Sequence, residues 1–234
     1  MGFVPSLSWL GFYLKKDIHP EPKYLITRTF LMGIIIAPLA VAAQWSFKTI
    51  MPYVFPGLGT GSSALFFLWA AFIEELVKFL AVRFMVLNNP AFDEPIDAME
   101  YMIAAGVGFA AIENILVLFQ TIPSGFGDTL NIWLLRFVGA TLLHAVSSAL
   151  VGYFLALSWF YKRHSVKLII LGLVVATGFH FAFNIILLGY QGKMEGFYYS
   201  TAFLIIAALI VSYIFKRLKK SRAANKTIIN SSTS

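Results

Sequence analysis

The chain has 234 residues, of which 59% are hydrophobic and only 12% are charged, and its mean hydropathy is +0.79. Soluble domains carry about 25% charged residues, so this composition excludes a water-soluble globular domain and indicates an integral membrane protein. Cysteine is absent, which excludes disulfides, thiol catalysis and thiolate metal sites. The net charge is +7, but the basic residues cluster at the ends of apolar runs, where membrane orientation explains them. Nucleic acid is therefore not an expected partner.

Apolar runs of spanning length predict an all-α fold, a polytopic membrane helical bundle. In chain order, six clear transmembrane helices are expected over residues 25–48, 63–87, 98–122, 130–160, 166–189 and 197–217. Clusters of proline, glycine or asparagine separate most of them, including the breaks at residues 56–61 and 189–196. The apolar run before Lys15 is too short for a full crossing, so it predicts a short N-terminal span or an interfacial helix.

The distribution of basic residues predicts the orientation in the membrane. With the C-terminus in the cytoplasm, the basic clusters at residues 15–28, 162–167 and 216–226 all fall on the cytoplasmic side, as the positive-inside rule requires. Residues 1–217 are expected to form a single transmembrane domain. Residues 218–234 are expected to form a basic, polar cytoplasmic tail that is disordered from Ser221 onward.

The informative residues are polar ones inside the apolar spans. An ionised group at mid-bilayer costs about 2.5–3.5 kcal/mol on insertion scales, so such groups usually face the bundle interior and have a function. They lie on four separate predicted helices: Glu74, Glu75, Lys78, Glu113, His144, His180 and Asn184. At 1.5 Å of rise per residue, the acids and histidines fall roughly 13 to 21 Å below the outer surface, so they can meet in one layer open to the outer side.

Spacing within the helices predicts how these groups are paired. Glu74 and Lys78 are four residues apart in the favourable order for a same-face ion pair, while Glu75 points elsewhere. His180 and Asn184 are also four apart, so both can donate a hydrogen bond to one oxygen. Arg136, near the outer interface, either snorkels to the surface or joins the site.

Several chemistries are excluded by missing motifs. The sequence has no HExxH motif and no GxSxG serine elbow. The GxGD sequence at residues 125–128 lacks the second intramembrane Asp that an aspartyl protease needs. What remains is a carboxylate with two histidines, in which a buried glutamate acts as general base on a water and the His and Asn donors hold the oxyanion.

Three alternatives use the same residues. Glu, His and His can bind zinc with an open position, which predicts a zinc-dependent protease. Buried acids and histidines are also ordinary in a proton-coupled transporter. A third alternative is a non-catalytic scaffold.

The motifs resemble those of one known family. They are EExxK at Glu74, Glu75 and Lys78, GFAAIEN over residues 108–114, the segment over residues 136–144, and HxxxN at His180 and Asn184. In this order, they resemble the PrsW family of intramembrane proteases, within the superfamily of the CAAX prenyl endopeptidases and Abi proteins. The similarity covers residues 11–217, so residues 1–217 are expected to be one protease domain.

The resemblance implies a membrane-embedded, metal-independent glutamic peptidase without a cofactor. Its expected partners are the lipid bilayer and a single-pass membrane substrate of the anti-sigma factor type, cut first on its extracytoplasmic side in a stress-response cascade. Its expected location is the bacterial plasma membrane. By the superfamily pattern, the catalytic residues are Glu74, Glu75, Glu113, His144, His180 and Asn184, with Lys78 and Arg136 in supporting roles. In this hypothesis Glu74 or Glu75 deprotonates water, and His144 positions the water or shuttles its proton. His180 with Asn184 stabilises the oxyanion, and Lys78 neutralises the spare acid.

Overall fold

The computed structural model describes residues 1–15, 20–54, 64–190 and 193–232, and within these ranges the secondary structure is entirely helical. The helices are α1 Phe3–Leu14, α2 Lys23–Val54, α3 Ala64–Met85, α4 Asp97–Thr121, η1 Ile122–Ser124, α5 Phe126–Val138, α6 Ala140–Phe160, η2 Lys162–His164, α7 Ser165–Gly189 and α8 Met194–Ser232. The all-α prediction is confirmed. The predicted break at residues 56–61 lies outside the described residues, as do residues 16–19 of the first basic cluster and residues 191–192 of the last break.

Five helical segments of the described chain are long and apolar enough to cross a membrane, which makes this a multi-pass membrane protein. They are Lys23–Val54, Asp97–Ser124, Phe126–Phe160, Lys162–Gly189 and Glu195–Leu218. The prediction of six clear spans is therefore one too many. The helix expected over residues 63–87 exists as α3, but Glu74, Glu75, Lys78 and Arg83 make its 22 residues too polar to count as an apolar span. The N-terminal helix α1 has 12 residues and packs against α4.

The helix predicted over residues 130–160 is divided in two. Gly139 separates α5 from α6 with φ −84° and ψ −85°. A Cβ atom on Gly139 would lie 2.7 Å from the Leu135 carbonyl oxygen, so this turn favours glycine. Helix α5 begins at Phe126, and none of its residues is buried. In contrast, most residues of α6, which follows the break, are buried in the core.

Helix α4 forms the centre of the core, and glycines let its neighbours approach it closely. A Cβ atom on Gly33 of α2 would collide with the backbone of Ala105, and one on Gly108 of α4 would collide with the carbonyl of Phe30. Gly152 of α6 lies against the α4 backbone in the same way. Small residues at such crossings are how membrane helices gain close packing without a hydrophobic driving force between them.

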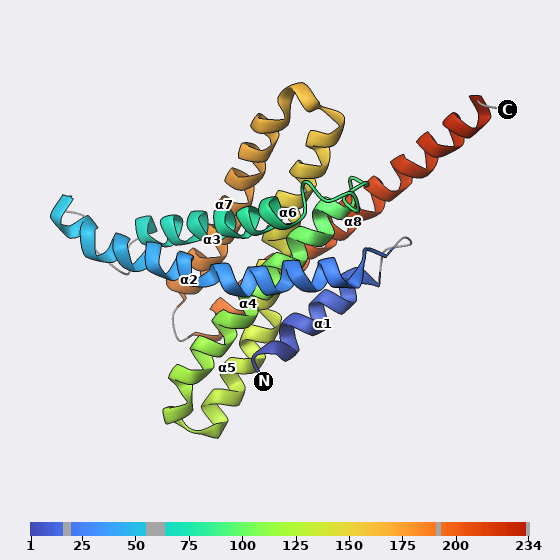
Figure 1. Cartoon of the computed structure of the whole chain (residues 1–234). Helices are drawn as coiled ribbons and strands as arrows, with labels where there is room; N and C mark the ends of the chain where they lie inside the picture. Colours follow the sequence, from blue (N-terminus) through green and yellow to red (C-terminus); the bar gives the residue numbers. More distant parts are fainter. Residues whose placement is uncertain (16–19, 55–63, 191–192, 233–234) are drawn as a thin grey trace.

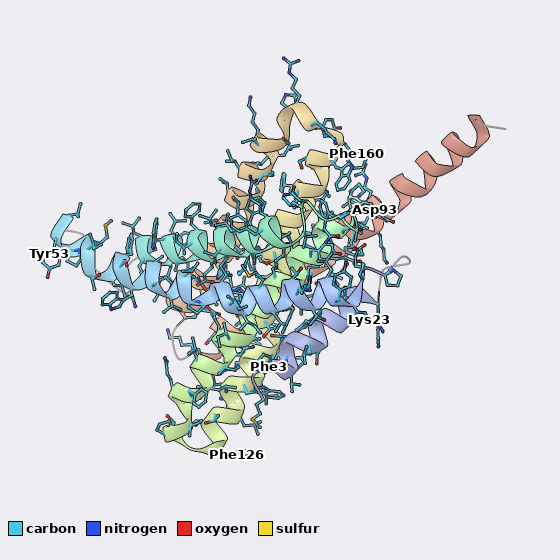
Figure 2. All side chains as sticks on the ribbon, viewed as in Figure 1. Phe3, Lys23, Tyr53, Asp93, Phe126 and Phe160 are labelled. Carbon is cyan, nitrogen blue, oxygen red and sulfur yellow. The ribbon has the colours of Figure 1, made fainter. Side chains whose placement is uncertain are left out.

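Helices α2 and α3 lie side by side and run across α4, α6 and α7 (Figure 1). The middle of α3 therefore contacts α4, α6 and α7 at one crossing. Apolar side chains project outward along the long helices (Figure 2), as expected for surfaces that face lipid. Examples are Ile35, Leu39, Trp45, Val174, Leu209 and Tyr213.

The disorder expected from Ser221 onward stays a prediction, although the structure extends a helix into this segment. Helix α8 continues without interruption to Ser232. The reason lies in the sequence, which contains neither glycine nor proline after Gly196 and so lacks the residues that usually end a helix.

Candidate active site

Three charged residues of α3 lie at the crossing of the helices. Glu74, Glu75 and Lys78 are all buried, and the Glu75 and Lys78 side chains are 0% exposed. The two glutamates are neighbours in the chain, so their side chains leave the helix about 100° apart and reach different helices. Buried charges of this kind persist only when they are paired and hydrogen-bonded.

One carboxylate oxygen of Glu75 accepts three hydrogen bonds, whose donors lie on three different helices. Its Oε1 atom accepts from Lys78 Nζ at 2.7 Å, from Ser147 Oγ of α6 at 2.9 Å and from His180 Nδ1 of α7 at 2.9 Å. The predicted ion pair between Glu74 and Lys78 is therefore wrong, because the ammonium pairs with Glu75 instead. Spacings of three and four residues both place side chains on one helix face, and here contacts with α6 and α7 decide between them.

His144 of α6 joins the ammonium of Lys78 to the carboxylate of Glu113. Lys78 Nζ lies 2.7 Å from His144 Nδ1, and His144 Nε2 lies 2.9 Å from Glu113 Oε2. An ammonium can only donate, so Nδ1 accepts and the ring proton sits on Nε2, where it donates to Glu113. The Lys78 ammonium also lies 4.9 Å from the ring centroid of Phe109.

Glu113 of α4 forms the more accessible edge of the cluster. Its side chain is 28% exposed and lies 3.2 Å from Arg136 NH2, whose side chain is 19% exposed. Arg136 Nε donates to Asn114 Oδ1 at 2.7 Å, and Asn114 Nδ2 donates to Thr141 Oγ1 at 2.9 Å. Arg136 thus joins the cluster, which was one of the two options that the sequence left open.

Glu74 has a different environment from Glu75. Its Oε1 atom accepts from Gln44 Nε2 of α2 at 2.8 Å, and its Oε2 atom lies 3.6 Å from His180 Nε2, too far for a good hydrogen bond. Among the described residues, no donor bonds to Oε2 of Glu74 or to Oε2 of Glu75. The carboxylate of Glu74 is therefore held at one oxygen by a neutral amide, and its other oxygen has no donor among the described residues.

Asn184 is the predicted site residue that the structure leaves out of the cluster. It is half-buried on α7, one turn after His180, and makes no hydrogen bond to the cluster within the described chain. Both ring nitrogens of His180 face glutamates, so His180 and Asn184 do not converge on one oxygen as predicted. The structure brings together the other predicted residues: Glu74, Glu75, Lys78, Glu113, Arg136, His144 and His180.

Comparison with known proteins shows which family the chain resembles. Residues 21–212 match the model of the family described as PrsW family intramembrane metalloprotease. The chain belongs to the PrsW family. A protein named Protease PrsW from Oceanobacillus iheyensis is 28% identical over 98% of this chain and 97% of its own, and one from Bacillus subtilis is 26% identical over 96% and 95%. A third, from Geobacillus kaustophilus, is 35% identical over 50% of each chain. No solved structure matches.

Membership of the PrsW family makes the chain a membrane peptidase, and the family description raises the question of a metal. Glu74, His144 and His180 offer ligand atoms that all lie within 4.8 Å of one another, and all three residues are buried. A carboxylate with two imidazoles is a donor set of catalytic zinc sites that keep an open position, so the residues fit a zinc ion. For His144 to ligate, one ring nitrogen must give up its contact with Lys78 or Glu113.

Two polar residues of this PrsW site were missed as participants by sequence reasoning. Gln44 is a lone amide in the apolar run of α2, and it donates a hydrogen bond to the Glu74 carboxylate. Ser147 was not predicted as a site residue, yet it donates a hydrogen bond to Glu75. The available signal was the one already used for the acids, a hydrogen-bonding side chain within a membrane span.

Proposed function

We propose that this peptidase is an intramembrane glutamic endopeptidase in which Glu74 is the general base. The observation that carries the proposal is the unequal environment of the two neighbouring carboxylates. Glu75 accepts three hydrogen bonds, one of them from an ammonium, whereas Glu74 accepts one from a neutral amide. Compensation of the Glu75 charge leaves Glu74 as the carboxylate that can take a proton from water.

His180 positions the attacking water in this proposal. Its Nδ1–H donates to Glu75, so the lone pair of Nε2 faces Glu74 Oε2 across 3.6 Å. A water bound to both acceptors presents its oxygen to the substrate carbonyl. Glu74 takes one proton as the new C–O bond forms, and it returns the proton to the amide nitrogen as the C–N bond breaks.

His144 and Lys78 supply the positive side of the site. The Nε2–H of His144 points toward the accessible edge at Glu113, and Lys78 supports the ring from Nδ1. A donor held in this way by a buried cation can stabilise the oxyanion that develops on the substrate. This assignment replaces the predicted pair of His180 and Asn184.

A zinc-dependent reaction remains the alternative within the same peptidase activity. Glu74, His144 and His180 would hold the ion, which would supply Lewis-acid activation of the carbonyl and of water. Under either chemistry, Gln44 orients Glu74 and Ser147 orients Glu75.

The proposed substrate is a single-pass membrane protein of the anti-sigma factor type, cut first on its extracytoplasmic side in a bacterial stress response. The resemblance of the motifs to the PrsW family supports this class. The clustering of basic residues supports a plasma-membrane protein with its C-terminus in the cytoplasm.

The proposal is tested in cells that lack this gene and receive each variant from a plasmid. The measurement is the processing of tagged single-pass membrane proteins. Glu74→Gln should abolish processing at normal expression, because the amide cannot accept the proton. Glu195→Gln is the matched control, since Glu195 is exposed on α8, and it should process normally. Full processing by Glu74→Gln would reject this base, and chelation followed by zinc addition to the purified enzyme separates the two chemistries.

A further inference from the structure

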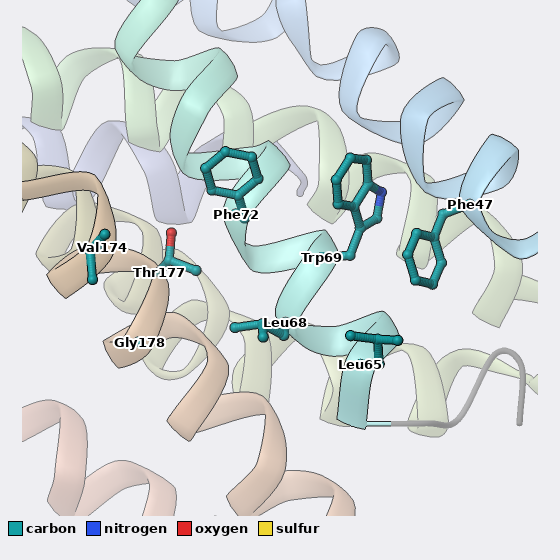
Figure 3. Close-up of a pocket in the computed structure, with 8 residues that line it drawn as sticks. All are labelled: Phe47, Leu65, Leu68, Trp69, Phe72, Val174, Thr177 and Gly178. Carbon is teal, nitrogen blue, oxygen red and sulfur yellow. The ribbon is translucent and has the colours of Figure 1, made fainter. Parts of the chain in front are cut away.

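An apolar groove of about 470 Å³ lies between α2, α3 and α7 (Figure 3). Its lining includes Phe47, Leu68, Trp69, Phe72, Thr177 and Gly178. The volume is within the range of about 300–1,000 Å³ that is usual for small-ligand pockets. Leu68 and Val174 are 40% and 61% exposed, so the groove opens sideways, along surfaces that face lipid.

The groove lies one helical turn from the proposed catalytic site on each of its three helices. On each of its three helices, a lining residue is followed or preceded by a cluster residue three positions away, which places both on one face. The pairs are Gln44 with Phe47, Phe72 with Glu75, and Thr177 with His180. A molecule lying in the groove is therefore about one helical turn from Gln44, Glu75 and His180.

Two residues of α7 make the groove suitable for a ligand. A Cβ atom on Gly178 would meet nothing within 4 Å, so this position faces open space. Thr177 is only 7% exposed, and its Oγ1 atom has no hydrogen-bond partner among the described residues. In contrast, Thr27 and Thr29 satisfy their hydroxyls with the carbonyl four residues earlier, both at 2.8 Å. A buried hydroxyl without a partner is costly, and Thr177 points to a ligand that has a polar atom.

A lipid chain would fill the groove but leave the Thr177 hydroxyl unpaired. An extended peptide carries both apolar side chains and a row of backbone N–H and C=O groups. We infer that the groove binds a large apolar side chain of the substrate beside the scissile bond, while the Thr177 hydroxyl bonds the substrate backbone. This inference rests on the proposed protease function, and it names the apolar groove between α2, α3 and α7 as the determinant of specificity.

Filling the groove tests the inference through activity. The probe is a set of synthetic Leu/Ala transmembrane peptides with a single Phe at successive positions, in liposomes with the purified enzyme. Gly178→Leu should lower kcat/KM at least tenfold for the peptides cut beside Phe, and replacing that Phe by Ala should restore cleavage. Gly189→Leu, on the same helix and also facing open space, should leave kcat/KM unchanged. Equal cleavage by the two variants would overturn the inference.

Cross-linking tests binding without catalysis. Because the chain has no cysteine, Leu68→Cys introduces a single thiol, and Leu209→Cys on α8 is a matched control that is 66% exposed. In a Glu74→Gln background, oxidation should join Leu68→Cys, but not Leu209→Cys, to peptides that carry one cysteine next to the Phe. Gly178→Leu and Thr177→Val should each reduce this product at least fivefold, while Thr177→Ser retains it.

The two experiments separate failure of the groove from failure of the protease proposal. Selective cross-linking at Leu68→Cys with no cleavage by the wild type would support peptide binding in the groove and reject the proposed function. Equal cross-linking at both cysteines, or a product that survives Gly178→Leu, would show a surface covered by lipid and overturn the inference.

Discussion

Replacing Lys78 by Met tests whether one buried ammonium holds the acids and histidines together. Lys78 Nζ lies 2.7 Å from Glu75 Oε1 and 2.7 Å from His144 Nδ1, and both charged side chains of the ion pair are 0% exposed. Removal of one partner from a buried pair costs about 3–5 kcal/mol, because the remaining charge is uncompensated. Glu75 keeps its bonds from Ser147 and His180, so the lower end, about 3 kcal/mol, is expected for Lys78→Met. That corresponds to roughly a hundredfold change in the folding equilibrium.

The assay is equilibrium unfolding of the purified protein in mixed detergent micelles, followed by tryptophan fluorescence. Lys167→Met is the control, because Lys167 is exposed on α7. This substitution should change the protein's free energy of unfolding by less than about 0.5 kcal/mol. The double variant Lys78→Met with Glu75→Gln removes both charges and should recover most of the lost stability. A loss no larger than that of Lys167→Met, or no recovery in the double variant, would refute the pairing of Lys78 with Glu75.

Three further predictions address packing, the edge of the site and the metal. Gly33→Val should destabilise the fold by about 1–3 kcal/mol because its side chain meets the Ala105 backbone, whereas Gly11→Val, which faces open space, should be neutral in the same unfolding assay. Arg136→Gln should lower the free energy of unfolding by less than about 1 kcal/mol, because its ion pair with Glu113 is partly exposed. The same variant should lower peptide cleavage at least tenfold. Similar cleavage by Arg136→Gln and by an Arg163→Gln control would contradict this prediction. Removal of metal ions by chelation should leave cleavage unchanged, and a loss that zinc restores would favour the zinc-dependent reaction.

Hydropathy predicts most of the fold because membrane insertion depends on local composition. The all-α architecture and the long spans follow from runs of apolar residues, and α3 departs from the prediction only through its four charges. The break at Gly139 was not predicted, because no proline or polar turn accompanies it. A single glycine within an apolar run is compatible with either a continuous or a divided helix. Contacts with the rest of the bundle determine which of the two forms.

The polar residues of the cluster are recognisable from sequence because each is expensive within a membrane, but their pairing is not. Lys78 has two carboxylates within reach on its own helix, and the choice of Glu75 depends on His144 from α6. Asn184 has the right spacing from His180, yet both nitrogens of that ring face the glutamates of α3, and Nδ1 is bonded to Glu75. Spacing along one helix defines which side chains share a face, whereas partners on other helices determine which bonds form.

The same reasoning explains why two adjacent glutamates can have different roles. Two carboxylates side by side in an apolar interior repel each other unless one of them is compensated. The 100° step along α3 directs Glu75 toward Lys78 and Ser147 and directs Glu74 toward Gln44 of α2. His180 lies between them, bonded to Glu75 through Nδ1 and facing Glu74 with Nε2. The bond to Glu75 defines the tautomer of His180, and this tautomer leaves a lone pair on Nε2 facing Glu74. In the proposed mechanism, the compensated Glu75 thus prepares the site at which Glu74 acts as the base.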